Sequence, residues 1–160
     1  MEDNDATTSQ LPKSRSRRPS RDARFVDGGP KVRLGSGACR PRQPSCAING
    51  CAFCLDMHSK DLRARGEAEQ RIYMLSAWRE VPNLYSARER AALAWAEAVT
   101  RLTNQDVSDE VYNEARGEFS EKELAQLTLS IVAINGWNRL NVAFRTPAGN
   151  YKSAIKQSAA

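Results

Sequence analysis

The sequence predicts an all-α fold of about five helices, and three observations support this prediction. From residue 46 onward, apolar residues recur at helical spacing, and no strand-like alternation occurs. Two Ser-x-x-Glu segments, Ser86 to Glu89 and Ser120 to Glu123, match the capping box that opens helices. Turn residues such as Gly66 separate the apolar segments. The 160 residues therefore fit one small helical domain and a terminal segment.

The expected elements follow one another from residue 51. They are helices from about Cys51 to Arg65, Glu67 to Glu80, Ser86 to Leu102, Ser108 to Arg116 and Ser120 to Phe144, with residues 150–160 as a C-terminal tail. Ile72, Leu75, Trp78 and Trp95 lie on apolar helical faces, where we expect core packing. The segment LTLSIVAI is apolar nearly all round, so we expect burial on several sides, in part against partner subunits.

The positive charge of the chain is confined to its first 45 residues. Residues 1–45 hold ten Lys and Arg against five Asp and Glu, whereas residues 46–160 hold fourteen of each. The net charge of +5 therefore does not indicate a basic, nucleic-acid-binding fold. Arg, Pro, Ser and Gly dominate residues 1–45. Since such a segment buries too little apolar surface to offset its ordering entropy, we expect it to be disordered.

We expect a cytoplasmic protein. The early charges are not followed by an apolar run of about 7–15 residues, as a secretory signal requires. No stretch of about 18 apolar residues predicts a membrane span. In a reducing compartment, cysteines more often bind metals or take part in catalysis than form structural disulfides.

Three of the four cysteines and the single histidine lie within residues 46–58. Cys51, Cys54 and His58 are spaced by three and four residues, so on a helix they form one stripe, with Cys51 in the first turn. The helix N-terminus favours a thiolate, and His58 can accept its proton or stabilise it as an imidazolium. This set suits a dithiol redox centre, in which a thiolate attacks an oxidant and the neighbouring thiol closes a disulfide.

Two other interpretations stay open at this point. A zinc site would use the same three side chains with a fourth ligand from Cys46, Cys39 or Asp56, although the spacing matches no common structural zinc site. A purely structural disulfide would close a very short loop and stabilise little. We favour the redox dithiol and expect no bound metal or cofactor.

The chain closely resembles the alkylhydroperoxidase D-like group of the carboxymuconolactone decarboxylase superfamily over about residues 46–149. The resemblance rests on the segments INGCAFCLDMHSKDLRARGE, LSAWRE, LYSARERAALAWAEAVT and FSEKELAQLTLSIVAINGWNRLNVAFR. It implies an all-helical fold that assembles into trimers or hexamers. It also implies an antioxidant activity that reduces organic hydroperoxides to alcohols, with the disulfide reduced again by a dithiol such as a lipoyl group. The decarboxylases of the superfamily lack the cysteine pair, which argues against lactone decarboxylation here.

By motif position, the resemblance implies a role for each residue of the cysteine motif. Cys54 would be the peroxide-attacking thiol, Cys51 its resolving partner and a member of the proton relay, and His58 the group that helps to deprotonate Cys54. The family places a glutamate of this relay on a preceding helix, about twelve residues before the first cysteine. That position is Cys39 here, and no glutamate occurs within residues 3–66. We therefore expect the preceding core helix and the relay acid to be missing and the activity to be impaired.

The composition changes abruptly at Ala47-Ile48, from Arg- and Pro-rich to family-like sequence. GC-rich coding DNA read out of frame gives such a composition, so we hypothesise that residues 1–45 are frame-shifted or rearranged. Resequencing the upstream DNA tests this hypothesis, because a family-like helix should then be encoded in another frame. A second Ile-Asn-Gly, at Ile134 to Gly136, echoes Ile48 to Gly50, and we interpret the echo as similar packing rather than a second site. Asn138 and Arg139 beside it could line a pocket, cap a helix or meet an interface.

Overall fold

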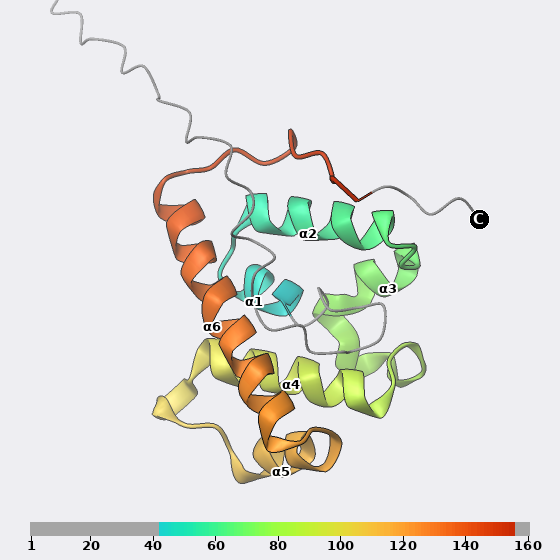
Figure 1. The fold of residues 1–160 in the computed structure, drawn as a ribbon, viewed down its shortest axis with the longest axis vertical. Helices are drawn as coiled ribbons and strands as arrows, with labels where there is room; N and C mark the ends of the chain where they lie inside the picture. The colour runs from blue at the N-terminus through green and yellow to red at the C-terminus, as the bar shows by residue number, and fades with distance from the viewer. Residues whose placement is uncertain (1–41, 156–160) are drawn as a thin grey trace, which may run out of the picture.

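The computed structural model describes residues 42–155, and within this range the chain is helical and has no β-strand (Figure 1). The α-helices are α1 (Arg42–Ile48), α2 (Ala52–Ala64), α3 (Glu69–Tyr73), α4 (Ala87–Arg101), α5 (Asp109–Glu118) and α6 (Glu121–Ala143). Short 3-10 segments lie between them, namely η3 (Met74–Glu80), η4 (Pro82–Leu84) and η5 (Thr103–Gln105). The predicted all-α class is confirmed.

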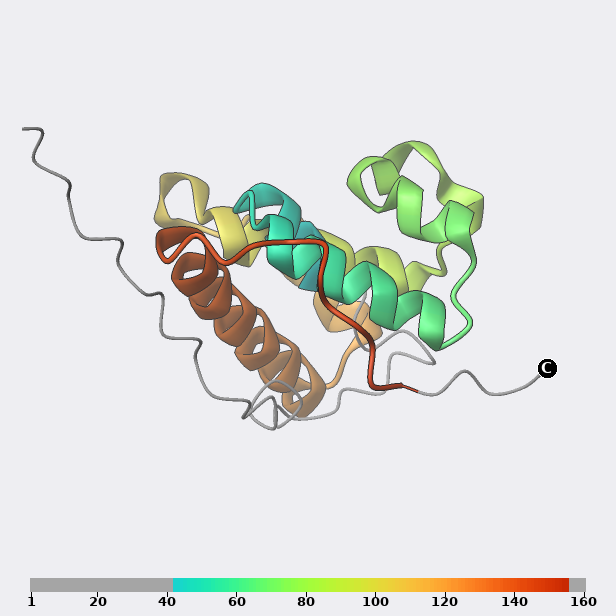
Figure 2. The same ribbon diagram turned by 90° about the horizontal axis from the view of Figure 1, so that it is seen from above.

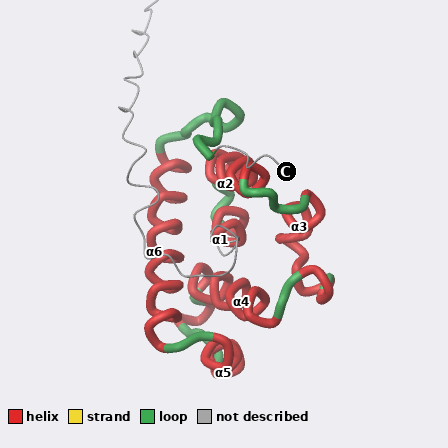
Figure 3. Tube along the Cα trace, turned by 45° about the vertical axis from the view of Figure 1, so that its right-hand side comes forward, coloured by secondary structure: helices red, strands yellow, loops and turns green. Residues whose placement is uncertain are grey.

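The short helix α1 lies at the centre of the arrangement. It contacts α2, α4 and α6. Figure 3 shows that α6 runs along one side of the molecule, past α2, α1 and α4. The segment after α6 turns back and crosses over α2 (Figure 2). Tyr151 Oη and Ser153 Oγ fasten it there, because both donate hydrogen bonds to Asp61 Oδ1, at 3.1 and 2.6 Å. Helix α2, which carries the cysteine motif from its N-cap Cys51 onward, thus contacts α1, α6 and the C-terminal segment.

Helical order begins earlier than the sequence predicts. We expected residues 1–45 to be disordered and the core helix before the motif to be missing, but α1 starts at Arg42. Gln43, Pro44 and Ser45 are buried in it. Pro44 is tolerated because it lies in the first turn, where a backbone N–H would have no helical partner. The expectation is therefore wrong for residues 42–45, while residues 1–41 lie outside the described part of the chain.

The polar side chains of α1 form hydrogen bonds with other helices. This explains why the disorder predicted from composition is wrong for residues 42–45. Gln43 Nε2 donates to Ser59 Oγ on α2 at 2.7 Å. Ser45 Oγ lies 2.8 Å from Thr100 Oγ1 on α4, with a hydrogen bond between the two hydroxyls. Contacts with three helices compensate for the ordering entropy that the segment could not offset by itself.

The second expected helix, Glu67 to Glu80, is not continuous. It consists of α3 followed by η3, with a non-helical residue, Ala77, inside η3 (φ −120°, ψ 27°). The predicted core residues Ile72, Leu75 and Trp78 are nevertheless buried. Ile72 lies on α3, and Leu75 and Trp78 lie on η3, so the buried side continues from α3 into η3 in spite of the irregular residue Ala77.

The remaining helix starts agree with the sequence. Both predicted capping boxes are present, with Ser86 accepting from the N–H of Glu89 and Ser120 from the N–H of Glu123. Ser108 caps α5 in the same way. Helix α6 ends at Ala143, one residue before the predicted end.

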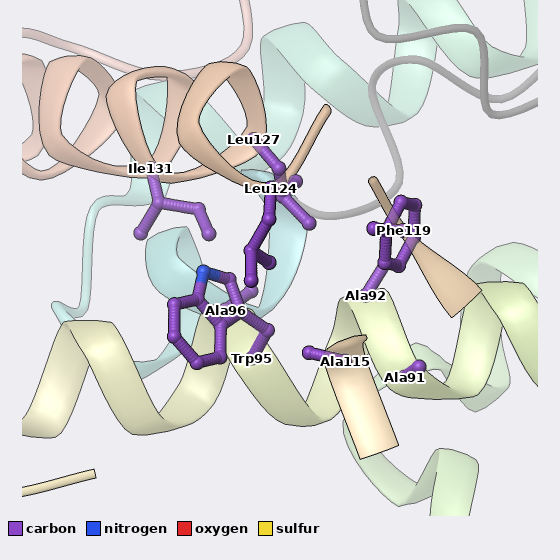
Figure 4. Close-up of a cluster of buried hydrophobic side chains, with 9 residues drawn as sticks. All are labelled: Ala91, Ala92, Trp95, Ala96, Ala115, Phe119, Leu124, Leu127 and Ile131. Carbon is purple, nitrogen blue, oxygen red and sulfur yellow. The ribbon is translucent and has the colours of Figure 1, made fainter. Parts of the chain in front are cut away.

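The largest buried apolar cluster joins α4, α5 and α6 (Figure 4). It consists of Ala91, Ala92, Trp95, Ala96, Ala115, Phe119, Leu124, Leu127 and Ile131. Trp95 lies at its centre, and its Nε1 donates to Thr128 Oγ1 at 2.9 Å. Trp78 belongs to a second cluster with Leu62, Ile72, Leu75, Tyr85, Leu93 and Ala94. Both tryptophans are core residues, as predicted.

Helix α6 is buried on one side only within the single chain. Leu127 and Ile131 are buried, whereas Leu129 is 60% exposed and Val132 is 56% exposed. The expected burial on several sides is therefore wrong for the isolated subunit. The remaining exposed apolar side chains toward the end of this helix are Trp137, Leu140, Val142 and, just beyond it, Phe144. Across residues 42–155, no helix is long and apolar enough to cross a membrane.

Candidate redox site at the start of helix α2

Cys51 is the residue that caps the N-terminus of α2. Its backbone is extended (φ −83°, ψ 91°), and its Sγ accepts a hydrogen bond from the N–H of Cys54 at 3.3 Å. Gly50 before it has a φ of +65°, a left-handed conformation that glycine adopts easily and that turns the chain from α1 into α2. Cys51 thus lies one position before the first turn in which we expected it. Its sulfur still receives a backbone hydrogen bond that favours negative charge.

Cys51 and Cys54 form a disulfide, with their Cα atoms 5.3 Å apart. This separation is ordinary for a disulfide, so the helix start accommodates the oxidised pair. Each of the two side chains is only 1% exposed. Any molecule that reacts with them must therefore be small, or must reach them through movement of the surrounding side chains.

His58 lies one turn beyond Cys54 on the buried face of α2. Cys54 and His58 of the predicted stripe lie four residues apart on the buried face of α2, which Leu62 continues, whereas Cys51 of that stripe is the N-cap residue. The imidazole is 2% exposed. The structure thus places all three predicted site residues on one element, while their catalytic roles remain a prediction.

Cys46 joins the same buried cluster from α1. Cys46, Cys51, Cys54 and Ile134 pack together, and Phe53 and Leu55 lie against them. Cys46 is fully buried and is the free thiol among the cysteines of residues 42–155. Burial raises the pKa of the Cys46 thiol to about 11, so this group is protonated at neutral pH.

The side-chain amide of Asn138 lies against this thiol. In one orientation its Nδ2 donates to Cys46 Sγ at 3.3 Å. In the reverse orientation Nδ2 would donate to the backbone oxygens of Ser45 and Ile134, at 3.3 Å each, and Oδ1 would face the thiol. The first orientation also lets Asn49 Nδ2 donate to Asn138 Oδ1 at 3.0 Å, whereas the reverse orientation would set two amide nitrogens at that distance.

A network of buried amides connects this region to α4 and α6, and sequence reasoning missed it. Asn49 Nδ2 donates to Asn135 Oδ1 at 2.6 Å, and Asn135 Nδ2 donates to Thr100 Oγ1 at 3.1 Å. Asn138 is fully buried beside them and lines, with Asn49 and Arg139, a cavity of about 210 Å³. The repeated Ile-Asn-Gly segment was the sequence feature that could have predicted this network, because the asparagines of its two copies, Asn49 and Asn135, are hydrogen-bonded to each other.

Asp56, named as a possible fourth zinc ligand, is engaged elsewhere. Its carboxylate accepts from Lys60 Nζ at 2.9 Å and from the backbone N–H of Gly149 at 3.1 Å. The hydrogen bond from Lys60 lowers the pKa of Asp56. In the range that the structure describes, no group of three or more His, Cys, Asp or Glu side chains is arranged to hold a metal ion. Cys39 lies outside that range.

The fold and the site define a helical protein with a Cys-x-x-Cys disulfide at a helix start, and comparison with known proteins identifies its family. The model of the carboxymuconolactone decarboxylase family matches residues 45–98. Uncharacterized protein YdfG of Bacillus subtilis (strain 168) is 45% identical over 103 residues, which span 64% of this chain and 69% of that protein. The chain belongs to the carboxymuconolactone decarboxylase family.

A solved structure places the chain more closely within this family. It is the crystal structure of a protein of unknown function from Agrobacterium tumefaciens, named as a candidate antioxidant defence protein AhpD. The two chains share 41% sequence identity and a TM-score of 0.67, over 71% of this chain and 77% of that one. The alkylhydroperoxidase D-like resemblance is thereby confirmed. The family match begins at residue 45, close to the change in composition at Ala47-Ile48.

Proposed function

We propose that this chain reduces organic hydroperoxides to alcohols with its Cys51–Cys54 pair. The observation that carries the proposal is the disulfide at the N-terminus of α2, with the buried His58 one turn further along the same face. The family supports it, as does the name of the Agrobacterium relative, which assigns that protein to antioxidant defence.

The reaction proceeds in two steps at the reduced pair. His58 accepts the proton of the Cys54 thiol, and the thiolate attacks the terminal oxygen of the hydroperoxide. The O–O bond breaks, the alcohol leaves with a proton, and Cys54 becomes a sulfenic acid. The Cys51 sulfur then attacks the Cys54 sulfur, which releases water and forms the disulfide. Two electrons have passed from the two thiols to the hydroperoxide.

An external dithiol completes the cycle by reducing the disulfide and becoming oxidised itself. We propose a lipoyl group on a partner protein, or a similar dithiol, because the resemblance implies one. No bound cofactor takes part in this scheme. The need to reopen the disulfide in each cycle fits a reducing compartment such as the cytoplasm.

The amide network beside the site cannot replace the relay glutamate of the family. Cys39 occupies the corresponding position of the sequence, and the side chains of Asn49, Asn135 and Asn138 neither accept nor release protons near neutral pH. Since general acid–base assistance contributes about 10²–10⁴ in rate, we propose that this chain turns over more slowly than a member with the complete relay.

The test is thiol mapping by mass spectrometry on reduced protein, before and after one equivalent of an organic hydroperoxide. We expect loss of two thiols and a Cys51–Cys54 disulfide. Cys54→Ser should prevent the disulfide and leave Cys51 reduced, and His58→Gln should slow thiol loss about 10²-fold. The matched control is Cys46→Ser, which removes a buried thiol outside the pair and should leave the reaction intact. Two thiols that stay reduced in the folded parent protein would contradict the proposal.

A second candidate is a dithiol that senses or exchanges disulfides without efficient peroxide turnover. The 1% exposure of both cysteines favours a sensor that a small oxidant reaches, because burial slows the entry of the protein reductant that repeated turnover requires. This candidate predicts stoichiometric oxidation of the pair but no sustained hydroperoxide consumption when excess dithiothreitol is supplied. Sustained consumption would leave the peroxidase as the function.

A further inference from the structure

The turn between α1 and α2, residues 48–51, leads directly into the redox pair. Its backbone is connected to α1, because the N–H of Cys51 donates to the carbonyl oxygen of Cys46 at 3.0 Å. Gly50 lies inside the turn in the left-handed conformation, with a φ of +65°. Cys51 follows as the N-cap residue of α2. The conformation of this turn therefore determines where the Cys51 sulfur lies relative to Cys54.

The side chain of Asn49 connects this turn to α6. Its Nδ2 donates to Asn135 Oδ1 at 2.6 Å and to Asn138 Oδ1 at 3.0 Å. An amide nitrogen carries two hydrogens, so both donor positions of Asn49 are used. The bond to Asn135 is present in either orientation of the Asn138 amide. Residues 86 and 89 positions away in the sequence thus restrain the turn.

The acceptor on α6 is itself held in place by other hydrogen bonds. Asn135 Nδ2 donates to Thr100 Oγ1 on α4 at 3.1 Å and to the carbonyl oxygen of Ile131 at 3.0 Å. Thr100 Oγ1 in turn shares a hydrogen bond of 2.8 Å with Ser45 Oγ on α1. The Asn135 amide is therefore oriented by two other partners. An acceptor oriented in this way restrains the Asn49 side chain more than a freely rotating one would.

We propose that Asn49 is a positioning residue for the redox pair, which holds the turn in the conformation that brings Cys51 to Cys54. This proposal rests on the redox role of the pair in the proposed function. In the oxidised chain the disulfide also restrains the turn, whereas in the reduced chain this restraint is absent. Loss of the Asn49 bonds therefore frees the turn mainly in the dithiol form, and closing the disulfide must then order it again. The Asn49 bonds thus favour the disulfide over the dithiol.

The experiment measures the equilibrium of the Cys51–Cys54 pair with glutathione in the full chain. One glutathione disulfide oxidises the two thiols and becomes two glutathione molecules, so peptide mapping at a series of glutathione ratios gives the equilibrium constant. Asn49→Leu has a side chain of similar shape but no donor. We expect the constant for disulfide formation to fall about 3- to 10-fold, because one or two hydrogen bonds are lost. A tenfold fall raises the reduction potential by about 30 mV.

A double variant tests whether the bond between the two helices carries the effect. Asn135→Leu removes the acceptor from the α6 side and should lower the constant by a similar factor. In the double variant Asn49→Leu, Asn135→Leu the two factors should not multiply, because both changes break the same bond. Should Asn49→Leu not fold, Asn49→Ser breaks the same bonds with a shorter polar side chain, and the same fall in the constant is expected.

Two control variants distinguish positioning from a general loss of stability. Asn113→Leu makes the same substitution at an exposed position of α5, away from the turn. Ser120→Ala removes the cap of α6 and so lowers stability without changing the Asn49 bonds. Both variants should keep the equilibrium constant of the parent protein.

The proposal is overturned if the Asn49 variant keeps the parent constant, if the two leucine substitutions multiply, or if Ser120→Ala lowers the constant as much. The assay contains no hydroperoxide, so it is independent of peroxidase chemistry. A lowered constant in the Asn49 variant of a chain that consumes no hydroperoxide would refute the proposed function alone. Hydroperoxide consumption by the parent chain, with an unchanged constant in the variant, would refute the positioning role alone.

Discussion

Cys46 and Cys51 lie in one buried cluster but occupy different positions relative to the helices. Cys46 is enclosed on α1, where loss of hydration favours the protonated form and raises its pKa. Cys51 instead lies at the start of α2, where its sulfur is bonded to that of Cys54 and accepts a hydrogen bond from the backbone N–H of Cys54. Position relative to a helix end, rather than burial, distinguishes Cys51 from Cys46.

The thiol of Cys46 should make stability fall at alkaline pH. Its pKa is raised from 9.0 to about 11 in the folded chain, so the unfolded chain loses this proton first as pH rises. The contribution is complete below about pH 9 and is lost progressively toward pH 11, by up to about 1.4 kcal/mol per pH unit. Urea unfolding at pH 8 and pH 10.5 should show a loss about 1–2 kcal/mol larger for the parent chain than for Cys46→Ala. Equal losses in both proteins would contradict this assignment.

At the scale of elements, the capping boxes determine where the helices begin. At the start of α6, the Glu123 carboxylate accepts from the backbone N–H and the Oγ of Ser120, at 3.0 and 2.9 Å. It also accepts from Arg88 Nη2 on α4 at 2.7 Å. A local cap and a contact between helices therefore meet at one carboxylate, which positions the helix that borders the redox site.

Protonation of Glu123 should remove its contribution to stability. The backbone hydrogen bond from Ser120 lowers the pKa of Glu123 below its usual 4.5. Its contribution is thus present above pH 4.5 and is lost as pH falls through the lowered folded value. Glu123→Gln should lower the Tm at pH 7, and the difference from the parent should shrink toward pH 3. Replacing the cap itself, in Ser120→Ala, should cost about 1 kcal/mol.

The control for this prediction is Glu121→Gln, which removes the same charge from the first turn of α6 but leaves the capping box intact. If Glu121→Gln lowered the Tm as much as Glu123→Gln, the effect would be one of the helix dipole and not of the cap.

At the scale of the whole molecule, the exposed apolar side of α6 is the main feature that the single chain leaves uncovered. Leu129 and Val132 lie in the middle of this side, and Trp137, Leu140 and Phe144 extend it toward the C-terminus. Exposed apolar surface of this kind commonly forms an interface with another protein chain. We therefore propose that the chain forms a homo-oligomer through α6, in keeping with the trimers or hexamers that the resemblance implies.

Light scattering on the purified chain should give the mass of a trimer or hexamer. The double variant Leu129→Glu, Val132→Glu places two charges at the centre of the interface and should shift the mass to that of a monomer. Arg101→Glu, at an exposed position at the end of α4, makes the same change of −2 in charge away from α6 and should leave the oligomer intact. A monomeric parent protein would refute the interface.

The sequence by itself determined the helix starts and the cysteine stripe, since both depend on residues within four positions of each other. A capping serine and its glutamate, or Cys54 and His58, are brought together by the helix that contains them. The cysteine motif and the all-α fold class could therefore be predicted from this local geometry. The length of α6, the longest helix, could be predicted in the same way, but its burial on one side only could not.

Only the tertiary structure decided the features that join distant segments. The order of α1 depends on contacts with α2, α4 and α6, which composition cannot reveal. The hydrogen bond between Asn49 and Asn135 joins residues 86 positions apart. The enclosure of Cys46 also arises where α1 meets other helices. Which side chains lose water, and which polar atoms find partners, is settled by packing over the whole domain and not by local spacing.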